Sequence, residues 1–226
     1  MSAPRAILLD VGGVCLTNGW DHGSRRRAAE RFSLDYDELE RRHDALYAEF
    51  ERGELGLDAY LDHAVFWRDR PFSRDDFTEF MRAQSRPHED VLALVGRLRD
   101  RGGARLATLN NESRELNEFR IRRFGLDRLF EAFFSSCYLG VRKPSERIYR
   151  VALDVLGLDP DQVVFVDDRK ENLVAARMVG LRTVLADGAP SVARGLREAG
   201  VEVEGPAAED AAARDAESAT QRGDRR

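Results

Sequence analysis

The second half of the chain alternates short apolar segments with amphipathic segments of helical length, and this alternation constrains the fold more than any other feature. After Pro87 the pattern predicts helices at 89–101, 112–124, 145–156 and 171–179, with strands at 104–110, 132–136, 163–167 and 182–187. A glycine follows each predicted helix, as is typical of a helix C-terminus. Strands that alternate with such helices pair in parallel through right-handed crossovers. We therefore expect an α/β protein with an open doubly wound parallel sheet.

One more apolar segment, residues 6–11, lies at the start of the chain and runs into Gly12 and Gly13, which permit a tight turn. It is expected to be the first strand of the same sheet. From 20 to 86 the sequence is charged, with apolar residues at helical spacing, which predicts three or four amphipathic helices and no strand. The predicted organisation is a core of residues 1–19 and 87–204 with a helical cap, 20–86, inserted after the first strand. The Ala-rich tail, 205–226, has no apolar periodicity and is predicted to be disordered.

Charge and composition exclude several classes of function. The 36 basic residues against 41 acidic ones give a net charge of −5, which argues against nucleic acid as a principal partner. The two cysteines, Cys15 and Cys137, form neither a CxxC pair nor a multi-bridge disulfide framework, so a reducing compartment is expected. No apolar run is long enough for a signal peptide or a spanning helix. The protein is expected to be cytoplasmic, with no membrane partner.

Polar residues gather where the predicted strands end. These groups are Asp10 with Gly12 and Gly13, Asn110 with Asn111, Arg142 with Lys143 and Pro144, and Asp167 with Asp168. Ligands of open parallel sheets bind at this carboxyl edge. Acidic residues can hold Mg²⁺ there, one carboxylate can attack phosphorus, and lysine and amide donors can stabilise phosphoryl oxygens. The sequence therefore predicts a phosphoryl-transfer site. Lys143 is one of only two lysines among the 36 basic residues, which agrees with a need for a compact ammonium.

In this order, the groups resemble the motifs of the haloacid dehalogenase superfamily, especially its small-molecule phosphatases with a helical cap. The resemblance covers residues 5 to about 190 and implies a Rossmann-like core. Its motifs here are Leu9-Asp10-Val11-Gly12-Gly13-Val14, then Asn110, then Gly140-Val141-Arg142-Lys143-Pro144, then Val166-Asp167-Asp168 with Asn172. Within the superfamily, the chain looks most like bacterial sugar-phosphate phosphatases of the α-glucose-1-phosphate phosphatase kind. That closer likeness is carried by Glu51-Arg52-Gly53-Glu54, Arg142-Lys143-Pro144 with Glu146-Arg147-Ile148-Tyr149, and Asp167-Asp168.

The resemblance implies a nucleophile and a metal site. Asp10 would attack phosphorus and form an aspartyl-phosphate that water then hydrolyses. Mg²⁺ would lie beside Asp10, on Asp168 and the carbonyl of Gly12, with Asp167 as a neighbouring or alternative ligand. The implied activity is Mg²⁺-dependent hydrolysis of a small phosphorylated metabolite, with a sugar phosphate as one candidate. The chain is expected to act as a monomer or a homodimer.

The resemblance also implies the phosphate contacts. Lys143 would neutralise the nucleophile and the phosphoryl group, and Asn110 would donate to the phosphoryl oxygens. Such phosphatases usually have Ser or Thr directly before this asparagine, whereas this chain has Leu109. Thr108 lies one step earlier and is expected to point to the opposite face of the strand. A backbone amide or Asn111 is then expected to substitute for the missing hydroxyl.

Gly12 is a second departure and leaves two other functions open. Most phosphatases of the family have an aspartate at this position, which protonates the leaving group and activates water. Asp21, His22, His88 and Glu54 are candidates to replace it. The first alternative is carbon–halogen hydrolysis, because a halide needs no proton, although clustered acids such as Asp167 and Asp168 have little use in a metal-free reaction. The second is a catalytically impaired protein that binds a phosphorylated ligand.

Overall fold

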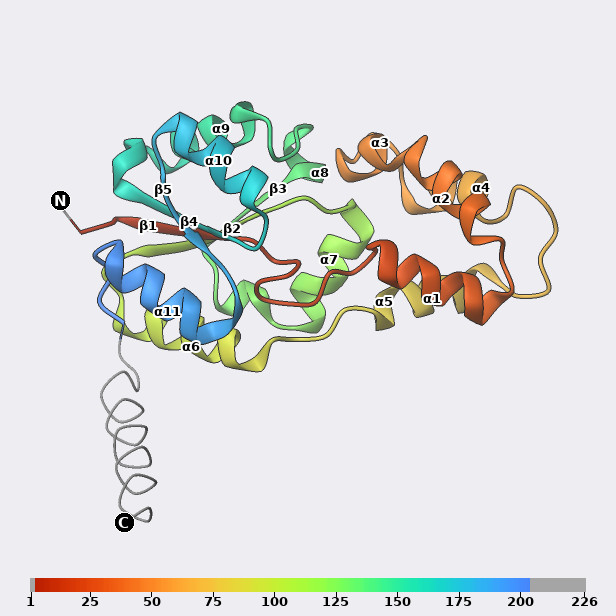
Figure 1. The fold of residues 1–226 in the computed structure, drawn as a ribbon, viewed down its shortest axis with the longest axis horizontal. Helices are drawn as coiled ribbons and strands as arrows, with labels where there is room; N and C mark the ends of the chain where they lie inside the picture. The colour runs from red at the N-terminus through yellow and green to blue at the C-terminus, as the bar shows by residue number, and fades with distance from the viewer. Residues whose placement is uncertain (1–2, 204–226) are drawn as a thin grey trace, which may run out of the picture.

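The computed structural model describes residues 3–203, and its centre is a five-stranded parallel sheet with the strand order β3-β2-β1-β4-β5 (Figure 1). The strands are β1 (Ala6–Leu9), β2 (Arg105–Asn110), β3 (Ala132–Ser135), β4 (Val163–Asp167) and β5 (Arg182–Leu185). β1 pairs with both β2 and β4, so the first strand of the chain lies in the middle of the sheet. The predicted open doubly wound parallel sheet is confirmed.

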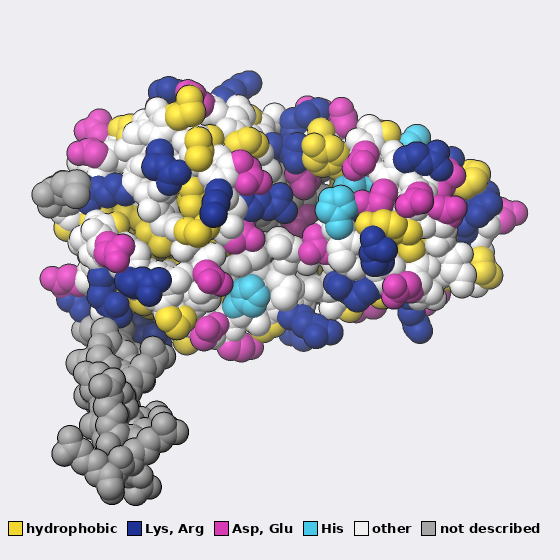
Figure 2. All heavy atoms as spheres, in the orientation of Figure 1, with side chains coloured by type: hydrophobic (Ala, Val, Ile, Leu, Met, Phe, Trp, Pro, Cys, Tyr) yellow, Lys and Arg dark blue, Asp and Glu magenta, His cyan; other side chains and the backbone are white. Residues whose placement is uncertain are grey.

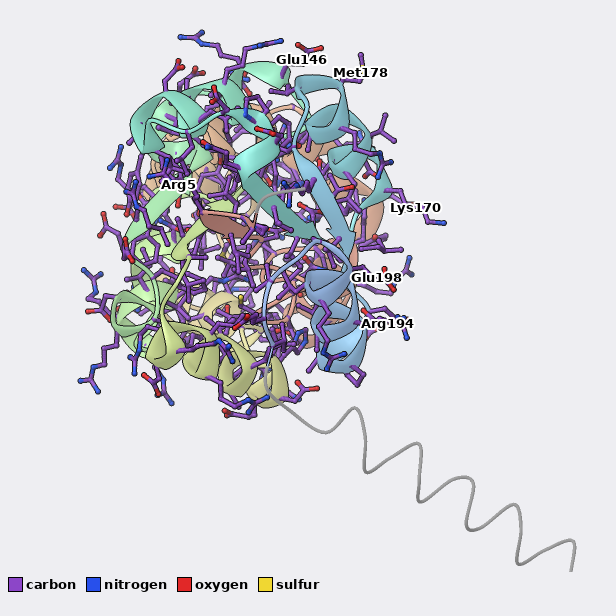
Figure 3. All side chains as sticks on the ribbon, turned by 90° about the vertical axis from the view of Figure 1, so that its left-hand side faces the viewer. Arg5, Glu146, Lys170, Met178, Arg194 and Glu198 are labelled. Carbon is purple, nitrogen blue, oxygen red and sulfur yellow. The ribbon has the colours of Figure 1, made fainter. Side chains whose placement is uncertain are left out.

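Helices cover both faces of the sheet. α6 (Glu89–Arg101) and α11 (Gly188–Glu198) pack on one face, and α9 (Glu146–Leu156) and α10 (Lys170–Val179) on the other (Figures 1 and 3). All four residues of β1 are fully buried. Ile7 and Leu9 join the apolar cluster under α6 and α11, while Ala6 and Leu8 join the one under α9 and α10. A strand buried on both faces must be apolar throughout, which explains the sequence of β1.

Shorter elements complete this core. α7 (Arg114–Arg123) follows β2, and the one-turn helix α8 (Ser136–Leu139) follows β3. Two 3₁₀ turns, η1 (Leu126–Arg128) and η2 (Pro160–Gln162), precede β3 and β4. Within the part of the chain that the structure describes, no helix is both long and apolar enough to cross a bilayer.

The helical segment, residues 22–83, extends from the carboxyl edge of the sheet (Figure 1). It contains α1 (His22–Phe32), α2 (Tyr36–Asp44), α3 (Tyr47–Glu51), α4 (Leu57–Ala64) and α5 (Arg74–Ala83). The sequence predicted three or four helices there, and the structure has five, because the apolar stripe across 39–50 is divided between α2 and α3. The segment has its own apolar core, which includes Phe50, Tyr60 and Phe77 and is joined by Leu116 of α7.

Two linkers connect the helical segment to the sheet, and they are bonded to each other. Thr17 accepts a hydrogen bond at Oγ1 from the Arg86 amide at 2.9 Å and donates from Oγ1 to the Gln84 carbonyl at 2.7 Å. The Thr17 amide also donates to the carbonyl of Arg86 at 2.8 Å. The two linkers are therefore joined by hydrogen bonds where the helical segment meets the core. The exact bounds of the core and the cap stay a prediction.

Two further details differ from the predictions. The first strand ends at Leu9, so Asp10 follows the strand instead of lying within it. The sequence pattern missed α11, although Val192 and Leu196 on this helix are fully buried. The predicted disordered tail, 205–226, lies outside the described residues.

A buried histidine sets a prediction for the pH dependence of stability. The Tyr60 hydroxyl accepts a hydrogen bond from Trp20 Nε1 at 2.7 Å and lies 2.9 Å from His43 Nδ1. While it accepts from Trp20, the hydroxyl still has its own proton to donate to His43 Nδ1 when this nitrogen is unprotonated. Burial, with the positive charge of Arg25, lowers the pKa of His43 to about 3. The folded protein therefore holds this imidazole in the neutral form.

The unfolded chain binds a proton at His43 below its ordinary pKa of 6.5, and the folded chain does not until about 3. This contribution to stability is therefore complete above pH 6.5 and falls as the pH drops, by up to about 1.4 kcal/mol per pH unit. We expect His43→Gln, which keeps an acceptor for Tyr60, to flatten the fall in the urea midpoint between pH 6.5 and 4. The exposed His63→Gln is the control. Equal slopes for His43→Gln and the unsubstituted protein would contradict this assignment.

Candidate active site

Asp10 and Asp167 are brought together by the parallel register of β1 and β4. Leu9 pairs with Val166, so the next residue of each strand carries a carboxylate to the same edge. Lys143 comes from the loop between α8 and α9, and its Nζ lies 2.9 Å from Asp10 Oδ1 and 2.7 Å from Asp167 Oδ2. All three side chains are buried. An ammonium between two carboxylates is the centre of the candidate active site.

Asp167 is held by contacts from its own turn. Its carboxylate accepts hydrogen bonds from the Arg169 amide at 2.8 Å and from Asn172 Nδ2 at 3.0 and 3.1 Å. Asn172 therefore fixes the orientation of Asp167 from the first turn of α10. Asp10 Oδ1 also accepts from the Val11 amide at 2.8 Å. The two carboxylates are thus fixed in place before any ligand binds.

Asp168 completes a group of three acids. One carboxylate oxygen from each of Asp10, Asp167 and Asp168 lies within 4.8 Å of the others. Asp168 Oδ1 is buried and has no hydrogen-bond partner among the residues that the structure describes. Gly13, at φ +80°, makes room for this side chain, because a Cβ there would lie 2.2 Å from Asp168 Oδ2. Clustered carboxylates with an unpartnered buried oxygen fit a hard divalent cation such as Mg²⁺.

Burial and like charge shape the ionisation of this group. Burial raises the pKa of Asp10 to about 7, against the attraction of Lys143. Burial and the charge of Asp167 raise the pKa of Asp168. Burial acts to lower the pKa of Lys143, but Asp10 and Asp167 outweigh it, so this pKa lies above its ordinary value. Lys143 is therefore positively charged at neutral pH, and a further cation at the site would favour the ionised form of Asp10.

The side-chain amides of the two asparagines at the end of β2 are hydrogen-bonded within the protein. Asn110 is buried, donates from Nδ2 to Asn117 Oδ1 at 3.1 Å and accepts from Ser135 Oγ at 2.9 Å, and it does not line the cavity. Asn111 lines the cavity, but its side-chain amide is bonded to the backbone of Lys143. Nδ2 donates to the Lys143 carbonyl at 3.0 Å, and Oδ1 accepts from the Lys143 amide at 2.8 Å. The structure therefore places both amides where they position neighbouring groups.

The residues just before these asparagines lie in the interior. Leu109 is fully buried in the apolar cluster under α9 and α10. Thr108 is also fully buried, and its Oγ1 has no hydrogen-bond partner among residues 3–203. No hydroxyl from β2 reaches the cavity, so the sequence-based expectation that a backbone amide or Asn111 must substitute for it stays a prediction.

A cavity of about 300 Å³ opens above the carboxylates, between the sheet and the helical segment. Figure 2 shows it as a hollow in the middle of the molecule, with acidic and basic side chains around it. Asp10, Gly12, Asn111 and Lys143 line it from the core, and Trp20, Asp21, Tyr47 and Glu51 from the helical segment or its linker. The predicted edge of the sheet is therefore hollowed at the place where the polar residues meet.

Of the four candidates to replace an acid at position 12, the structure brings only one to the cavity. Asp21 lines it, and its Oδ1 accepts the Ser24 amide at 2.7 Å as the N-cap of α1. His22 is exposed and bonded to Glu40, and Glu54 is exposed and paired with Arg52. His88 Nδ1 lies 2.8 Å from the Val14 carbonyl, away from the cavity lining.

Two ion pairs at the cavity were missed by the sequence analysis. Arg120 of α7 pairs with Glu112 at 2.8 Å, and both side chains are buried. Arg142 Nε lies 2.5 Å from Glu51 Oε2, and its guanidinium lies 4.6 Å from the centre of the Tyr47 ring. The second pair joins the loop of Lys143 to α3 of the helical segment. Glu112 lies two residues after Asn110, and this position was the one sequence signal that it belongs to the site. No sequence pattern pairs it with Arg120.

Comparisons with known proteins give the chain a family. A family model for haloacid dehalogenase-like hydrolases matches residues 4–180. Phosphoserine phosphatase of Thermus thermophilus is 30% identical over 219 residues, which cover 85% of this chain and 83% of that protein. Drimenol cyclase of Aspergillus calidoustus is 29% identical over 186 residues, or 80% of this chain. This chain spans about a third (34%) of the length of that cyclase.

Solved structures share the fold. A HAD-family enzyme of Bacteroides thetaiotaomicron, solved with magnesium and inorganic phosphate, matches with a TM-score of 0.68 at 18% identity, over 82% of this chain and 96% of that one. An L-2-haloacid dehalogenase matches with a TM-score of 0.60 at 24% identity, over 82% of this chain and 86% of that one. The name of the second protein states a dehalogenase, whereas that of the first states no reaction, so the shared fold does not identify the reaction of this chain.

Proposed function

The chain belongs to the haloacid dehalogenase-like hydrolases, and on that premise we propose that it is a Mg²⁺-dependent phosphomonoester hydrolase that acts on a small phosphorylated metabolite. One observation carries this proposal: Lys143 lies between Asp10 and Asp167, and Asp168 adds a third carboxylate, with a buried oxygen that has no hydrogen-bond partner within residues 3–203. A nucleophile, a positive charge and a metal-binding group thus meet at one edge of the cavity. The phosphatase relative and the phosphate complex of the structural neighbour support it.

In this proposal the chain's own residues divide the chemistry. Asp10 attacks phosphorus, and water later hydrolyses the aspartyl-phosphate. Asp10, Asp168 and the Gly12 carbonyl would hold Mg²⁺, with Asp167 as a neighbouring ligand, and the ion would supply positive charge for the phosphoryl oxygens. Lys143 orients Asp10 and adds positive charge to the same oxygens. The phosphate contacts of Asn110 and Asn111 stay predictions; their amides also hold Asn117 and the Lys143 backbone in place.

The helical segment is proposed to act as a cap that closes the cavity and selects the substrate. The cavity has a polar and aromatic wall, which suits a hydroxylated metabolite such as a sugar phosphate. This wall is formed by Trp20, Tyr47, Glu51 and Arg142. The α-glucose-1-phosphate phosphatase subgroup stays a prediction. A cytoplasmic location also stays a prediction. The two buried free cysteines agree with it.

A second candidate is hydrolysis of a carbon–halogen bond. Gly12 offers no acid side chain, and a halide leaves without a proton. The three clustered carboxylates favour the phosphatase, because buried like charges are costly unless a cation offsets them. A third hypothesis is a protein that binds a phosphorylated ligand but has impaired catalysis. It uses the same cavity and predicts ligand binding without turnover.

The proposal is tested by Mg²⁺-dependent phosphate release from p-nitrophenyl phosphate and a panel of sugar phosphates. Release that stops when a chelator is added would support it and rank the substrates. Halide release from 2-haloacids, with no phosphate release, would replace it with the second candidate. Thermal stabilisation by sugar phosphates without turnover at saturating Mg²⁺ would favour the ligand-binding reading.

The metal site makes a prediction that needs no activity. Saturation with Mg²⁺ at 100 times its Kd would stabilise the fold by about 2.7 kcal/mol, which is about 5–10 °C in Tm for a chain of this size. We expect Asp168→Asn to abolish this shift, because it removes the carboxylate with the unpartnered oxygen. Without Mg²⁺ the variant should be as stable as the unsubstituted protein or more stable, because one of three crowded charges is gone.

Differential scanning fluorimetry with and without Mg²⁺ measures both effects. Asp154→Asn, an exposed carboxylate on α9, is the matched control and should keep the full shift. A Mg²⁺ shift in Asp168→Asn equal to that of the control would rule out Asp168 as a ligand.

A further inference from the structure

Arg120 borders the space beside Gly12, together with Asn18. A Cβ built on Gly12 would lie 3.0 Å from Asn18 Oδ1 and 3.7 Å from Arg120 Nη1. A Cβ on Gly19 would lie 1.9 Å from Nη2, so only a glycine at position 19 lets the guanidinium take this position. Arg120 thus lies in the cavity wall between two glycines, one of them two residues after Asp10.

The neighbours of Arg120 fix it without using all its donors. Nη1 pairs with Glu112 Oε2 at 2.8 Å, Nε donates to Ser85 Oγ at 3.0 Å, and Nη2 donates to the Thr17 carbonyl at 3.3 Å. A guanidinium has five N–H groups. Two of them have no acceptor among the described residues, in a side chain that is only 3% exposed. Unpaired donors of a buried cation at a cavity wall are suited to a negatively charged ligand atom.

Two buried cations line the cavity within the described chain, and they differ in their surroundings. Lys143 lies between Asp10 and Asp167, on the side of the nucleophile. Arg120 lies beside Gly12 and Gly19 and is bonded to the linkers to the helical segment. The other arginines at the cavity are more open: Arg142 is partly exposed and paired with Glu51, and Arg169 is exposed. Arg120 is therefore a second buried positive group at the cavity, held by partners other than Asp10 and Asp167.

We propose that Arg120 stabilises the departing oxygen of the substrate and so replaces a proton donor; this inference rests on the proposed phosphatase function. As Asp10 forms its bond to phosphorus, the bond from phosphorus to the substrate oxygen breaks, and that oxygen keeps the electron pair. The alkoxide accepts hydrogen bonds from Arg120 and then takes a proton from water, which leaves hydroxide. Hydroxide attacks the phosphorus of the aspartyl-phosphate, which releases hydrogen phosphate and restores the Asp10 carboxylate. Glu112 is a positioning residue, because it holds Nη1 in place.

Leaving groups of different basicity test this inference. Glycerol phosphate and glucose 6-phosphate release basic alkoxides, whereas p-nitrophenyl phosphate releases a stable anion that needs little help. We expect Arg120→Gln to lower kcat for the alkyl phosphates by about 10²–10³-fold, as for the loss of one oxyanion donor. Its kcat for p-nitrophenyl phosphate should fall by no more than about tenfold. Retained turnover of p-nitrophenyl phosphate also shows that the variant is folded.

Two further variants separate position from charge. Gly19→Ala keeps all charges but displaces the guanidinium, and it should reproduce the selective loss for alkyl phosphates. Arg122→Gln, an exposed arginine on the same helix, is the matched control and should leave both substrates unaffected.

Arg120 also bonds both linkers, so a purely structural role for this residue has to be distinguished from a role in catalysis. An equal fall in kcat for alkyl and aryl phosphates in Arg120→Gln and in Gly19→Ala would overturn the inference and leave the phosphatase intact. Arg120→Lys provides a second check if the glutamine variant does not fold, and the same equal fall would overturn the inference. Absence of Mg²⁺-dependent turnover of every phosphomonoester by the unsubstituted protein would overturn the proposed function, and this inference with it.

Discussion

Asp10→Asn is expected to lower kcat for every phosphorylated substrate by about 10⁴-fold or more. The amide has nearly the shape of the carboxylate but cannot attack phosphorus, and removing the nucleophile of a covalent mechanism costs a large part of the rate enhancement. The fold should survive, because burial raises the pKa of Asp10 and so makes its charge costly to hold. The measurement is phosphate release at saturating Mg²⁺, with Tm recorded for the same samples.

The exposed Asp127→Asn serves as the control and should keep full activity. Rapid acid quenching adds an independent readout, since the unsubstituted protein should carry one phosphoryl group on the peptide that contains Asp10. Residual activity above about a tenth in Asp10→Asn, with no phosphorylated peptide in the unsubstituted protein, would exclude Asp10 as the nucleophile.

The centre of the site was predictable because parallel strands set it. Apolar segments identified β1 and β4, and their carboxyl ends had to meet at one edge of the sheet. The pairing of Leu9 with Val166 then brings Asp10 beside Asp167. Lys143 was predicted from its motif and its rarity, and the structure places its Nζ between these carboxylates. The local sequence pattern and the sheet topology agree here, so they left few alternative positions for these side chains.

The contacts of the asparagines were not predictable in the same way. The acceptor for Asn110 comes from Asn117 on α7, and its donor comes from Ser135 at the end of β3. Strand alternation gives the face on which a side chain lies, but it does not give the partners that other elements bring. The Arg120–Glu112 pair depends on the same kind of tertiary contact.

Helix α11 was not predicted because its local sequence has a weak helical propensity, although packing stabilises the helix. Gly188, Pro190 and Gly195 lie within it, and glycine in a helix interior costs about 1 kcal/mol relative to alanine. Gly195 is required by contact, because a Cβ there would lie 2.4 Å from Val184 Cγ1 on β5. Close packing of this helix on the sheet therefore outweighs its weak helical propensity.

Lys143→Met is expected to remove activity and to lower the stability of the metal-free protein by about 3–5 kcal/mol, the usual cost of removing one partner from a buried ion pair. Lys143 is 3% exposed, and its ammonium is the positive partner of both Asp10 and Asp167. Methionine keeps a similar length without the charge, so two buried carboxylates would then face each other. Urea denaturation without Mg²⁺ measures the loss of stability, and phosphate release measures the loss of activity.

Lys170→Met is the matched control, because Lys170 is the chain's other lysine and points to solvent at the start of α10 (Figure 3). Its stability should change by no more than about 0.5 kcal/mol. Adding Asp167→Asn to Lys143→Met should recover part of the lost stability, because the repulsion with Asp10 disappears, and such non-additivity identifies a direct interaction. Mg²⁺ should also recover stability in Lys143→Met, since a divalent cation offsets the same carboxylates, but not the activity. If Lys143→Met were as stable as Lys170→Met, the ammonium would not be what holds the two carboxylates together.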